Sequence, residues 1–259
     1  MKPYTFIPLL PLLATSLSAS VLVKYDFDKD HLGNTITGST TGGTNGPVIS
    51  TVYPSISFGA STAEPRVKKE YDNATDSPAN YYWKGWDGNM MRVKNHGPAS
   101  GPGVYAGSAN LADAVTNASY FAFTYNPTVA TSFTRISFQA AARVGTLNPL
   151  FELPVGITVR SSLTGTANLA ATSMINAYAE LAQYQSINID LTGFDEFQDH
   201  NGSPVTFYFY MDSQGTTARR EVFIDNLTLE GIQAIPESTS LLLAACGATG
   251  LIARRRRAR

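Results

Sequence analysis

The chain has 259 residues, of which 43% are hydrophobic and 15% are charged, which suits one large all-β domain with a buried core. Its formal net charge of −1 includes a basic contribution from Lys2 and from five arginines at the C-terminus. Without these and Glu237, 13 basic and 19 acidic residues remain, a net charge of −6. An acidic body with no basic stripe excludes a nucleic-acid partner. Cys246 is the only cysteine, so no intramolecular disulfide bond forms.

Residues 1–20, MKPYTFIPLLPLLATSLSAS, have the layout of a secretory signal peptide. A lysine precedes an apolar run, and the small residues Ser18 and Ser20 suit the −3 and −1 positions of a cleavage site. We therefore expect export and cleavage after Ser20. The alternative is an uncleaved membrane anchor, which the short run and its interruption by Pro8 and Pro11 disfavour.

Residues 21–232 are expected to form an all-β domain, because aromatic and β-branched residues favour strands. Apolar and polar residues alternate in several stretches separated by Gly, Asn, Pro and Asp. Many short strands at such intervals predict an antiparallel β-sandwich rather than a parallel α/β sheet. The stretches are Val21–Phe27, Tyr120–Tyr125, Phe133–Ala140, Gly156–Ser161, Ser186–Leu191, Val205–Met211 and Glu221–Leu229.

The segment Asn80–Gly88, NYYWKGWDG, contains both tryptophans, Trp83 and Trp86. Exposed aromatic rings in a loop stack on sugar rings, so these two residues are a candidate sugar-binding site. Their spacing beside polar residues also fits a strand with its rings buried in the core, which is the interpretation we favour.

Residues 169–184, LAATSMINAYAELAQY, depart from the alternating pattern. Their Ala, Leu, Met and Glu content, and the spacing of Met174, Tyr178 and Leu181, predict a helix from propensity alone.

Residues with catalytic potential are present but show no catalytic spacing. His31, His96 and His200 lack the spacing of zinc ligands and are interpreted as solvated loop residues. The sequence has no nucleophile elbow and no phosphate-binding glycine loop. A pair of carboxylates could still serve a glycoside hydrolase, so that activity stays open as the least favoured alternative. We expect no enzyme activity.

The C-terminal segment, residues 233–259, has an uncharged stretch from Ser238 to Ala253 followed by Arg254–Arg257. We predict a transmembrane helix over residues 237–253 and an arginine-rich cytoplasmic end over residues 254–259. Pro236 prevents the helix from continuing backward and leaves a joint that a membrane peptidase could reach.

This tail resembles the PEP-CTERM protein-sorting signal, which combines a Pro-Glu-Pro motif, an apolar span and a cluster of arginines. The motif here is Pro236-Glu237-Ser238, so the second proline is missing, and the arginines are Arg254, Arg255, Arg256 and Arg257. The resemblance implies that an exosortase, a membrane cysteine protease, cuts near the motif. The body then passes from an inner-membrane intermediate to the cell surface or the exterior of a bacterium that makes extracellular polysaccharide, as in a biofilm. An ordinary anchor that is never processed is the alternative.

The order of strand types in the body resembles the β-sandwiches common on PEP-CTERM proteins, which look like the jelly rolls of carbohydrate-binding modules. The resemblance is carried by Asp113-Ala-Val, Tyr120-Phe-Ala-Phe-Thr, Ile136-Ser-Phe, Val159-Arg-Ser-Ser-Leu, Val205-Thr-Phe-Tyr-Phe-Tyr and Phe223-Ile-Asp-Asn-Leu. It implies strand and loop, not helix, over residues 169–184. The favoured function is a non-enzymatic exported surface or matrix protein, and the alternative is a carbohydrate-binding module acting on extracellular polysaccharide.

In such jelly rolls the first and last strands often meet and hold a structural calcium ion. Carried onto this chain, the resemblance makes Asp28 and Asp225 the candidate calcium ligands, and carboxylate oxygens are ligands that calcium prefers. The alternative is that Asp28 and Asp30 are solvated turn residues and that Asp225 caps a bulge.

Overall fold

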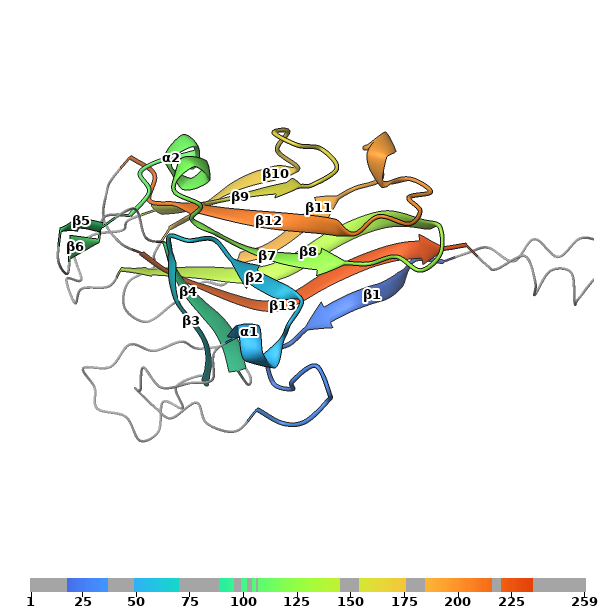
Figure 1. Cartoon of the computed structure of the whole chain (residues 1–259), viewed down its shortest axis with the longest axis horizontal. Helices are drawn as coiled ribbons and strands as arrows, with labels where there is room; N and C mark the ends of the chain where they lie inside the picture. Colours follow the sequence, from blue (N-terminus) through green and yellow to red (C-terminus); the bar gives the residue numbers. More distant parts are fainter. Residues whose placement is uncertain are drawn as a thin grey trace, which may run out of the picture.

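The computed structural model describes residues 18–36, 49–69, 89–95, 99–101, 104–105, 107–144, 154–175, 185–215 and 220–234. In these residues two antiparallel sheets face each other and enclose a hydrophobic core (Figure 1). The predicted all-β sandwich is therefore confirmed. Within the ranges given above, no helix is long and apolar enough to cross a membrane.

The larger sheet has six strands in the order β11-β8-β13-β4-β3, with β1 also beside β13. The central strand β13 pairs with β8 along one side. Its other side pairs first with β4 and then with β1. The strands are β1 (Ser20–Tyr25), β3 (Thr62–Lys69), β4 (Asn89–Asn95), β8 (Thr131–Val144), β11 (Gln185–Asp190) and β13 (Arg220–Gln233).

The smaller sheet has five strands in the order β10-β9-β12-β7-β2. The central strand β12 pairs with β7 on one side and β9 on the other. The strands are β2 (Ile56–Phe58), β7 (Tyr120–Tyr125), β9 (Pro154–Ser161), β10 (Ala170–Ile175) and β12 (Val205–Asp212). A separate short pair is formed by β5 (Ala99–Gly101) and β6 (Val104–Tyr105).

The described residues include three short helical segments outside the sheets: α1 (Ile49–Val52), α2 (Leu111–Thr116) and the 3-10 helix η1 (Asp195–Phe197). Asn110 caps α2, since its side chain accepts a hydrogen bond of 2.9 Å from the backbone N–H of Asp113. Figure 1 shows α2 beside one end of β12, the central strand of the smaller sheet.

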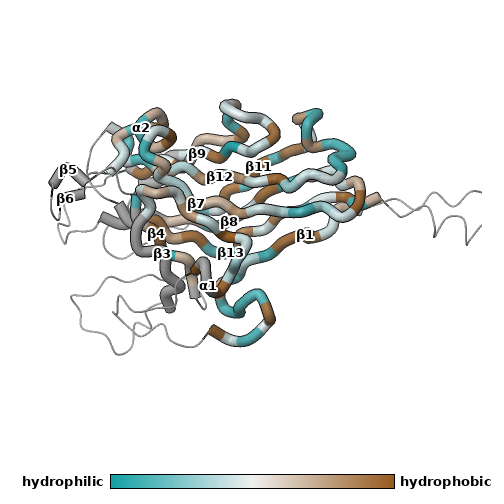
Figure 2. The backbone as a smooth tube through the Cα atoms, in the orientation of Figure 1, coloured by the Kyte–Doolittle hydropathy of each residue, from teal (hydrophilic) through white to brown (hydrophobic). Residues whose placement is uncertain are grey.

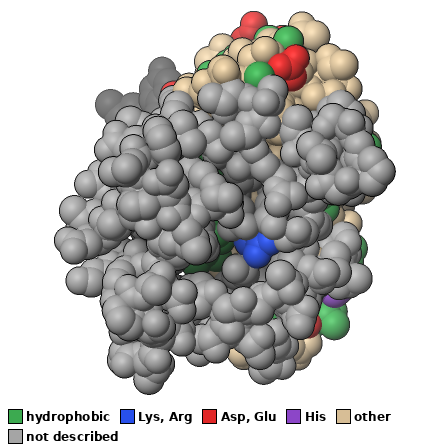
Figure 3. All heavy atoms as spheres, turned by 90° about the vertical axis from the view of Figure 1, so that its left-hand side faces the viewer, with side chains coloured by type: hydrophobic (Ala, Val, Ile, Leu, Met, Phe, Trp, Pro, Cys, Tyr) green, Lys and Arg blue, Asp and Glu red, His purple; other side chains and the backbone are tan. Residues whose placement is uncertain are grey.

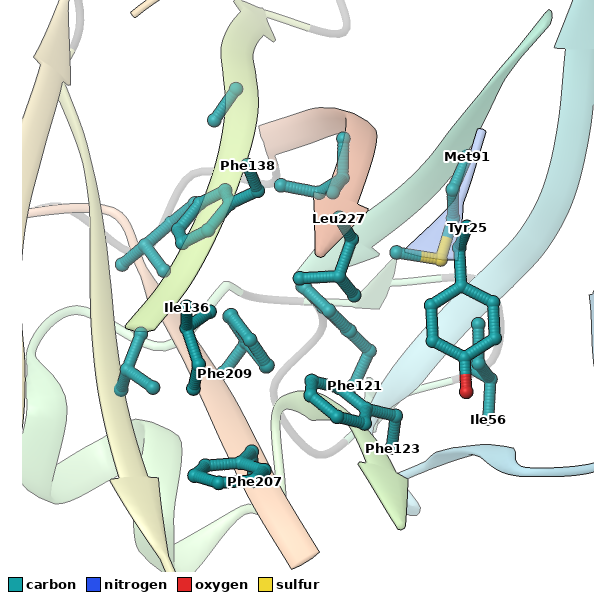
Figure 4. Packing of buried hydrophobic residues seen from close by; sticks show 14 of the residues in the cluster. Tyr25, Ile56, Met91, Phe121, Phe123, Ile136, Phe138, Phe207, Phe209 and Leu227 are labelled. Atoms are coloured by element: carbon teal, nitrogen blue, oxygen red, sulfur yellow. The ribbon is translucent and has the colours of Figure 1, made fainter. Parts of the chain in front are cut away.

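The core lies between the sheets because alternate residues of each strand point inward. Hydrophobic positions recur along the strands in Figure 2, and the phenylalanines of β7 and β12 have no exposed surface. Figure 4 shows these phenylalanines facing aliphatic and aromatic side chains of β8 and β13, among them Ile136, Phe138 and Leu227.

All seven predicted strands are present. β7 has the predicted bounds Tyr120–Tyr125, and the others differ by a few residues. β1 ends at Tyr25 rather than at Phe27, because Phe27 has a φ of 58°, in the left-handed region that does not continue a strand.

The helix predicted from propensity over residues 169–184 is wrong over Ala170–Ile175, which form β10. The pairing of β10 with β9, from Ala170 opposite Val159 to Ile175 opposite Pro154, outweighs the weak helix preference of this segment. Residues 176–184 lie outside the described residues.

The first and last described strands bring the two ends of the described chain together. Ser20 pairs with Gly231, and the backbone N–H of Ala234 donates a 2.8 Å hydrogen bond to the carbonyl oxygen of Ala130. Both ends therefore leave from the same end of the sandwich (Figure 1).

Candidate functional site

Three tyrosines gather on the outer face of the smaller sheet, turned away from the core. Tyr120 on β7 lies directly opposite Tyr210 on β12, and Tyr208 lies two residues earlier on β12. The ring centroid of Tyr120 is 5.3 Å from that of Tyr208 and 5.4 Å from that of Tyr210, both in edge-on geometry. The rings of Tyr208 and Tyr210 are 6.1 Å apart and nearly parallel. These partly exposed residues are the tyrosine cluster.

Strand alternation and one glycine position the tyrosine cluster. Phe121 and Phe209 point into the core, so their neighbours in the sequence point outward. Gly59 lies beside Tyr120, and a Cβ atom on Gly59 would lie 2.8 Å from the Tyr120 ring and 2.0 Å from the carbonyl oxygen of Ala118. The ring of Tyr120 therefore occupies its place only because residue 59 has no side chain.

Arg160 on β9 also lies on the outer face, beside the tyrosine cluster. It lies directly opposite Tyr208, and its Cζ atom is 5.7 Å from the centroid of the Tyr210 ring, a cation–π distance. Its Nε donates a 2.8 Å hydrogen bond to Oδ1 of Asn168, in the turn after β9. Among the residues that the structure describes, no carboxylate pairs with Arg160.

Hydroxyl groups continue the outer face on the other side of Tyr208. The hydroxyl oxygens of Thr124 and Thr206 lie 2.9 Å apart and share a hydrogen bond. The hydroxyl of Ser162 accepts a 3.0 Å hydrogen bond from the backbone N–H of Thr206. A hydroxyl group has one donor and two acceptor lone pairs, so these side chains keep acceptor capacity beyond the bonds that they make here.

The opposite end of the outer face, next to α2, is acidic. Asp212 ends β12 and is buried, with Gly156 on β9 leaving room for its carboxylate. Burial raises the pKa of Asp212; the hydrogen bond from the N–H of Gln214 lowers it, and the charge of Asp113 in α2 raises it further. Figure 3 views this end of the molecule and shows acidic side chains at its top, on the side where α2 lies.

The predicted calcium ligands Asp28 and Asp225 lie close enough for the charge of Asp28 to raise the pKa of Asp225. Asp225 on β13 is only 4% exposed, and burial raises its pKa to about 7, with Asp28 and Asp26 adding to the rise. Its carboxylate oxygens accept hydrogen bonds of 2.7 and 2.9 Å from the backbone and side-chain nitrogens of Asn226.

The pairing of β13 with β8 also shifts register between Asp225 and Thr228, so a bulge follows Asp225. The alternative role of Asp225, at a bulge, is therefore compatible with the geometry. The described part of the chain contains no group of three or more His, Cys, Asp or Glu side chains placed to hold a metal ion. Calcium binding by Asp28 and Asp225 stays a prediction.

Two further predicted sites lie outside the described residues. They are the sugar-binding candidates Trp83 and Trp86, and the sorting residues Pro236, Glu237 and Arg254–Arg257. Tryptophan stacking, exosortase processing and membrane insertion of the tail therefore stay predictions, as does cleavage after Ser20.

The described histidines make local hydrogen bonds in separate loops. Nδ1 of His31 lies 2.6 Å from the carbonyl oxygen of Val52, and Nε2 of His200 lies 2.9 Å from that of Ser203. His31 is exposed and His200 partly exposed, which agrees with their predicted positions in loops. His96 lies outside the described residues.

The sequence does contain a pattern that indicates the tyrosine cluster, but the prediction of strands did not use it. In YFAFTY and VTFYFYM, phenylalanines alternate with outward positions, and Tyr120, Tyr208 and Tyr210 occupy those outward positions. Outer strand faces are normally polar, so aromatic residues on both faces of one strand mark an unusual surface. Arg160 had no comparable signal, because the pairing of β9 with β12 is not visible in the sequence.

Comparison with known proteins gives structural similarity only. No protein-family model and no curated protein sequence matches the chain. The CBM22-1 xylan-binding domain from Paenibacillus barcinonensis Xyn10C is 10% identical, with a TM-score of 0.40 over 84% of this chain and 98% of that domain. The CBM28 module specific for non-crystalline cellulose is 12% identical, with a TM-score of 0.40 over 68% of this chain and 87% of the module.

A third solved structure, Caldicellulosiruptor saccharolyticus CBM27-1 in complex with mannohexaose, is 12% identical, with a TM-score of 0.36 over 69% of this chain and 90% of that chain. At such identities and TM-scores, the similarities assign no ligand to this protein.

Proposed function

We propose that the protein is a non-catalytic module that binds polysaccharide through the tyrosine cluster. The observation that carries the proposal is the presence of three partly exposed, mutually packed tyrosines on the outer face of a sheet. The outer face of a sandwich is ordinarily polar, so exposed aromatic rings there indicate a role other than packing in the core. Aromatic rings pack on the apolar faces of sugars, while the phenol hydroxyls and the nearby Thr124 and Thr206 offer hydrogen bonds.

The rings are held in place before a ligand arrives. They stand on the paired strands β7 and β12, and each ring packs against the other two. Ordering a flexible side chain on binding costs about 0.5–1.5 kcal/mol, and rings that are already fixed avoid most of this cost. The proposed ligand is of the class that the solved structures above bind, but the proposal depends only on the side chains of this face.

The test is to truncate the cluster and measure polysaccharide binding by affinity electrophoresis and calorimetry. Tyr208→Ala and Tyr210→Ala are each expected to weaken binding roughly tenfold, about 1.4 kcal/mol. Leu32→Ala is the control, because Leu32 is an exposed hydrophobic side chain outside the cluster. Thermal unfolding of every variant shows that it is folded. Unchanged binding in both cluster variants would contradict the proposal, as would release of new reducing ends from the bound polymer.

We also propose that the protein is exported and sorted through its tail, which rests on residues 1–20 and 233–259 of the sequence. Mass spectrometry of the protein recovered from its host is expected to show an N-terminus at Val21 and loss of Arg254–Arg257. Recovery of the intact chain from the cytosol would contradict export and sorting without affecting polysaccharide binding.

A further inference from the structure

We infer that the tyrosine cluster selects acidic polysaccharides, with Arg160 binding the carboxylate of a uronic acid whose neighbouring sugar packs on the tyrosines. The inference rests on the proposed function and adds the class of sugar that the site prefers. Four features of the described residues carry it: the charge left on Arg160, the orientation of its guanidinium group, the distribution of charge along the face and the acidity of the body.

The charge of Arg160 is not neutralised by another described side chain, and Arg135 shows what neutralisation looks like in this protein. Arg135 on β8 donates hydrogen bonds of 3.1 and 2.6 Å from Nε and Nη2 to the two carboxylate oxygens of Glu230 on β13. Hydrogen bonding to Glu230 raises the pKa of Arg135. Both arginines lie on outer sheet faces, but Arg160 contacts an amide oxygen and an aromatic ring in place of a carboxylate.

The guanidinium group of Arg160 makes its hydrogen bond to the described residues through Nε, and its two Nη groups make none with them. Asn168 accepts the hydrogen bond from Nε, and the Tyr210 ring lies against the guanidinium group. The two Nη groups form the fork that matches the two oxygens of a carboxylate. Asn168 and Tyr210 are thus positioning residues for Arg160, and the fork is set before the ligand binds.

Charge is distributed unevenly along the face. Asp212 follows Tyr208 by four residues on β12, a separation of about 13 Å along a strand, and Asp113 lies beyond it in α2. Arg160 lies opposite Tyr208, away from this acidic end. An acidic sugar is therefore attracted at the Arg160 end and repelled at the α2 end, which fixes where along the tyrosine cluster its carboxylate lies.

The negative charge of the body favours a polymer with few charges per sugar over a polymer with many. The net charge of −6 repels a densely sulfated polymer over distances comparable with the Debye length, about 8 Å at physiological ionic strength. A polyuronate carries one charge on each sugar and meets less of this repulsion, and a carboxylate held by Arg160 gains a short, charge-assisted bidentate contact that outweighs it. We therefore assign the carboxylate of a uronic acid, not a sulfate ester, as the preferred group.

The experiment compares one polymer in two forms: polygalacturonate, and the same polymer after chemical reduction of its carboxyl groups to neutral hydroxymethyl groups. The wild-type protein is expected to bind polygalacturonate at least tenfold more tightly. Arg160→Gln is expected to bind the two forms equally. Asn168→Asp keeps the arginine but places a carboxylate on its Nε, and it is also expected to abolish the preference. Arg135→Gln is the matched control and is expected to retain the preference.

The outcomes separate this inference from the function on which it rests. If the wild-type protein binds both forms equally, or Arg160→Gln keeps the preference, acidic selection by Arg160 is wrong although polysaccharide binding stands. If dextran sulfate competes more strongly than polygalacturonate, the assignment to a carboxylate is wrong. If Tyr208→Ala and Tyr210→Ala leave binding of both forms unchanged, the proposed site itself is wrong.

Discussion

Phe121 and Phe209 stack face to face across β7 and β12, with ring centroids 4.4 Å apart and planes inclined by 10°. They are directly opposite in the pairing of the two strands, and so are the adjacent residues Tyr120 and Tyr210 on the other face. The same pair of strands therefore carries an aromatic pair on each face. The inner pair is fully buried, whereas the outer pair is partly exposed.

This difference in burial predicts a difference in stability. Phe209→Ala is expected to lower the free energy of unfolding by about 3–5 kcal/mol, because it removes buried ring contacts and leaves a cavity. Tyr210→Ala removes a partly exposed ring and is expected to cost less than half as much. Urea-induced unfolding of the two variants measures both losses. Equal losses would mean that the outer ring is as important to folding as the core, contrary to its proposed role in binding.

A glycine substitution tests the close approach beneath Tyr120. Gly59→Ala places a Cβ atom 2.0 Å from the backbone carbonyl oxygen of Ala118, a contact that requires the backbone to move. We expect a loss of more than about 2 kcal/mol in the free energy of unfolding, as for other strained or overpacked substitutions. Gly193→Ala is the control, because nothing lies within 4 Å of its added Cβ atom. Similar stability of both variants would show that the segment around Gly59 adjusts without cost.

The predicted calcium site is tested by melting temperature. Calcium is expected to raise the melting temperature relative to the protein in a chelator, since an ion bound only by the folded state stabilises it. Asp28→Asn and Asp225→Asn are each expected to remove most of this shift, and Asp190→Asn, a change to an exposed carboxylate on β11, is expected to keep it. Identical melting temperatures of the wild-type protein with calcium and with chelator would exclude the site.

The raised pKa of Asp225 predicts a pH dependence of stability in chelator. Its pKa is about 7 in the folded protein, against about 3.9 for an unperturbed aspartate, so between these values the folded state holds a proton that the unfolded state has released. The contribution of Asp225 to stability is therefore complete below about pH 4 and is lost as the pH rises toward and through 7.

Asp225→Asn isolates this contribution, because the amide does not titrate. The difference in free energy of unfolding between wild type and variant is expected to change by a few kcal/mol between pH 5 and pH 8, with the wild type losing stability relative to the variant. Parallel pH profiles would show that Asp225 titrates normally in the folded state.

The strands were predictable because alternation depends on which residues face the core, and that pattern is local. Tyr120–Tyr125 shows this most clearly, since its bounds in the structure are those predicted. Residues 170–175 show the limit, because their composition favours a helix and only their pairing with β9 makes them a strand. Propensity is worth a few tenths of a kcal/mol per residue, less than a paired and packed strand gains.

The candidate site was less predictable, because it forms across strands that are distant in the sequence. Arg160 meets Tyr208 and Tyr210 only through the register of β9 with β12. Asp28 and Asp225 were named together from the resemblance to jelly rolls alone, and the charge of Asp28 raises the pKa of Asp225. Neither of these two relationships can be predicted from the spacing of the residues along the chain.

The position of β13 has a mechanical consequence. This last described strand lies in the interior of its sheet, with β8 on one flank and β4 and β1 on the other. A pull on the C-terminal end of β13 loads its pairings with these neighbours along their length. Many backbone hydrogen bonds must then break together. The strand therefore resists extraction better than an edge strand whose hydrogen bonds break one after another.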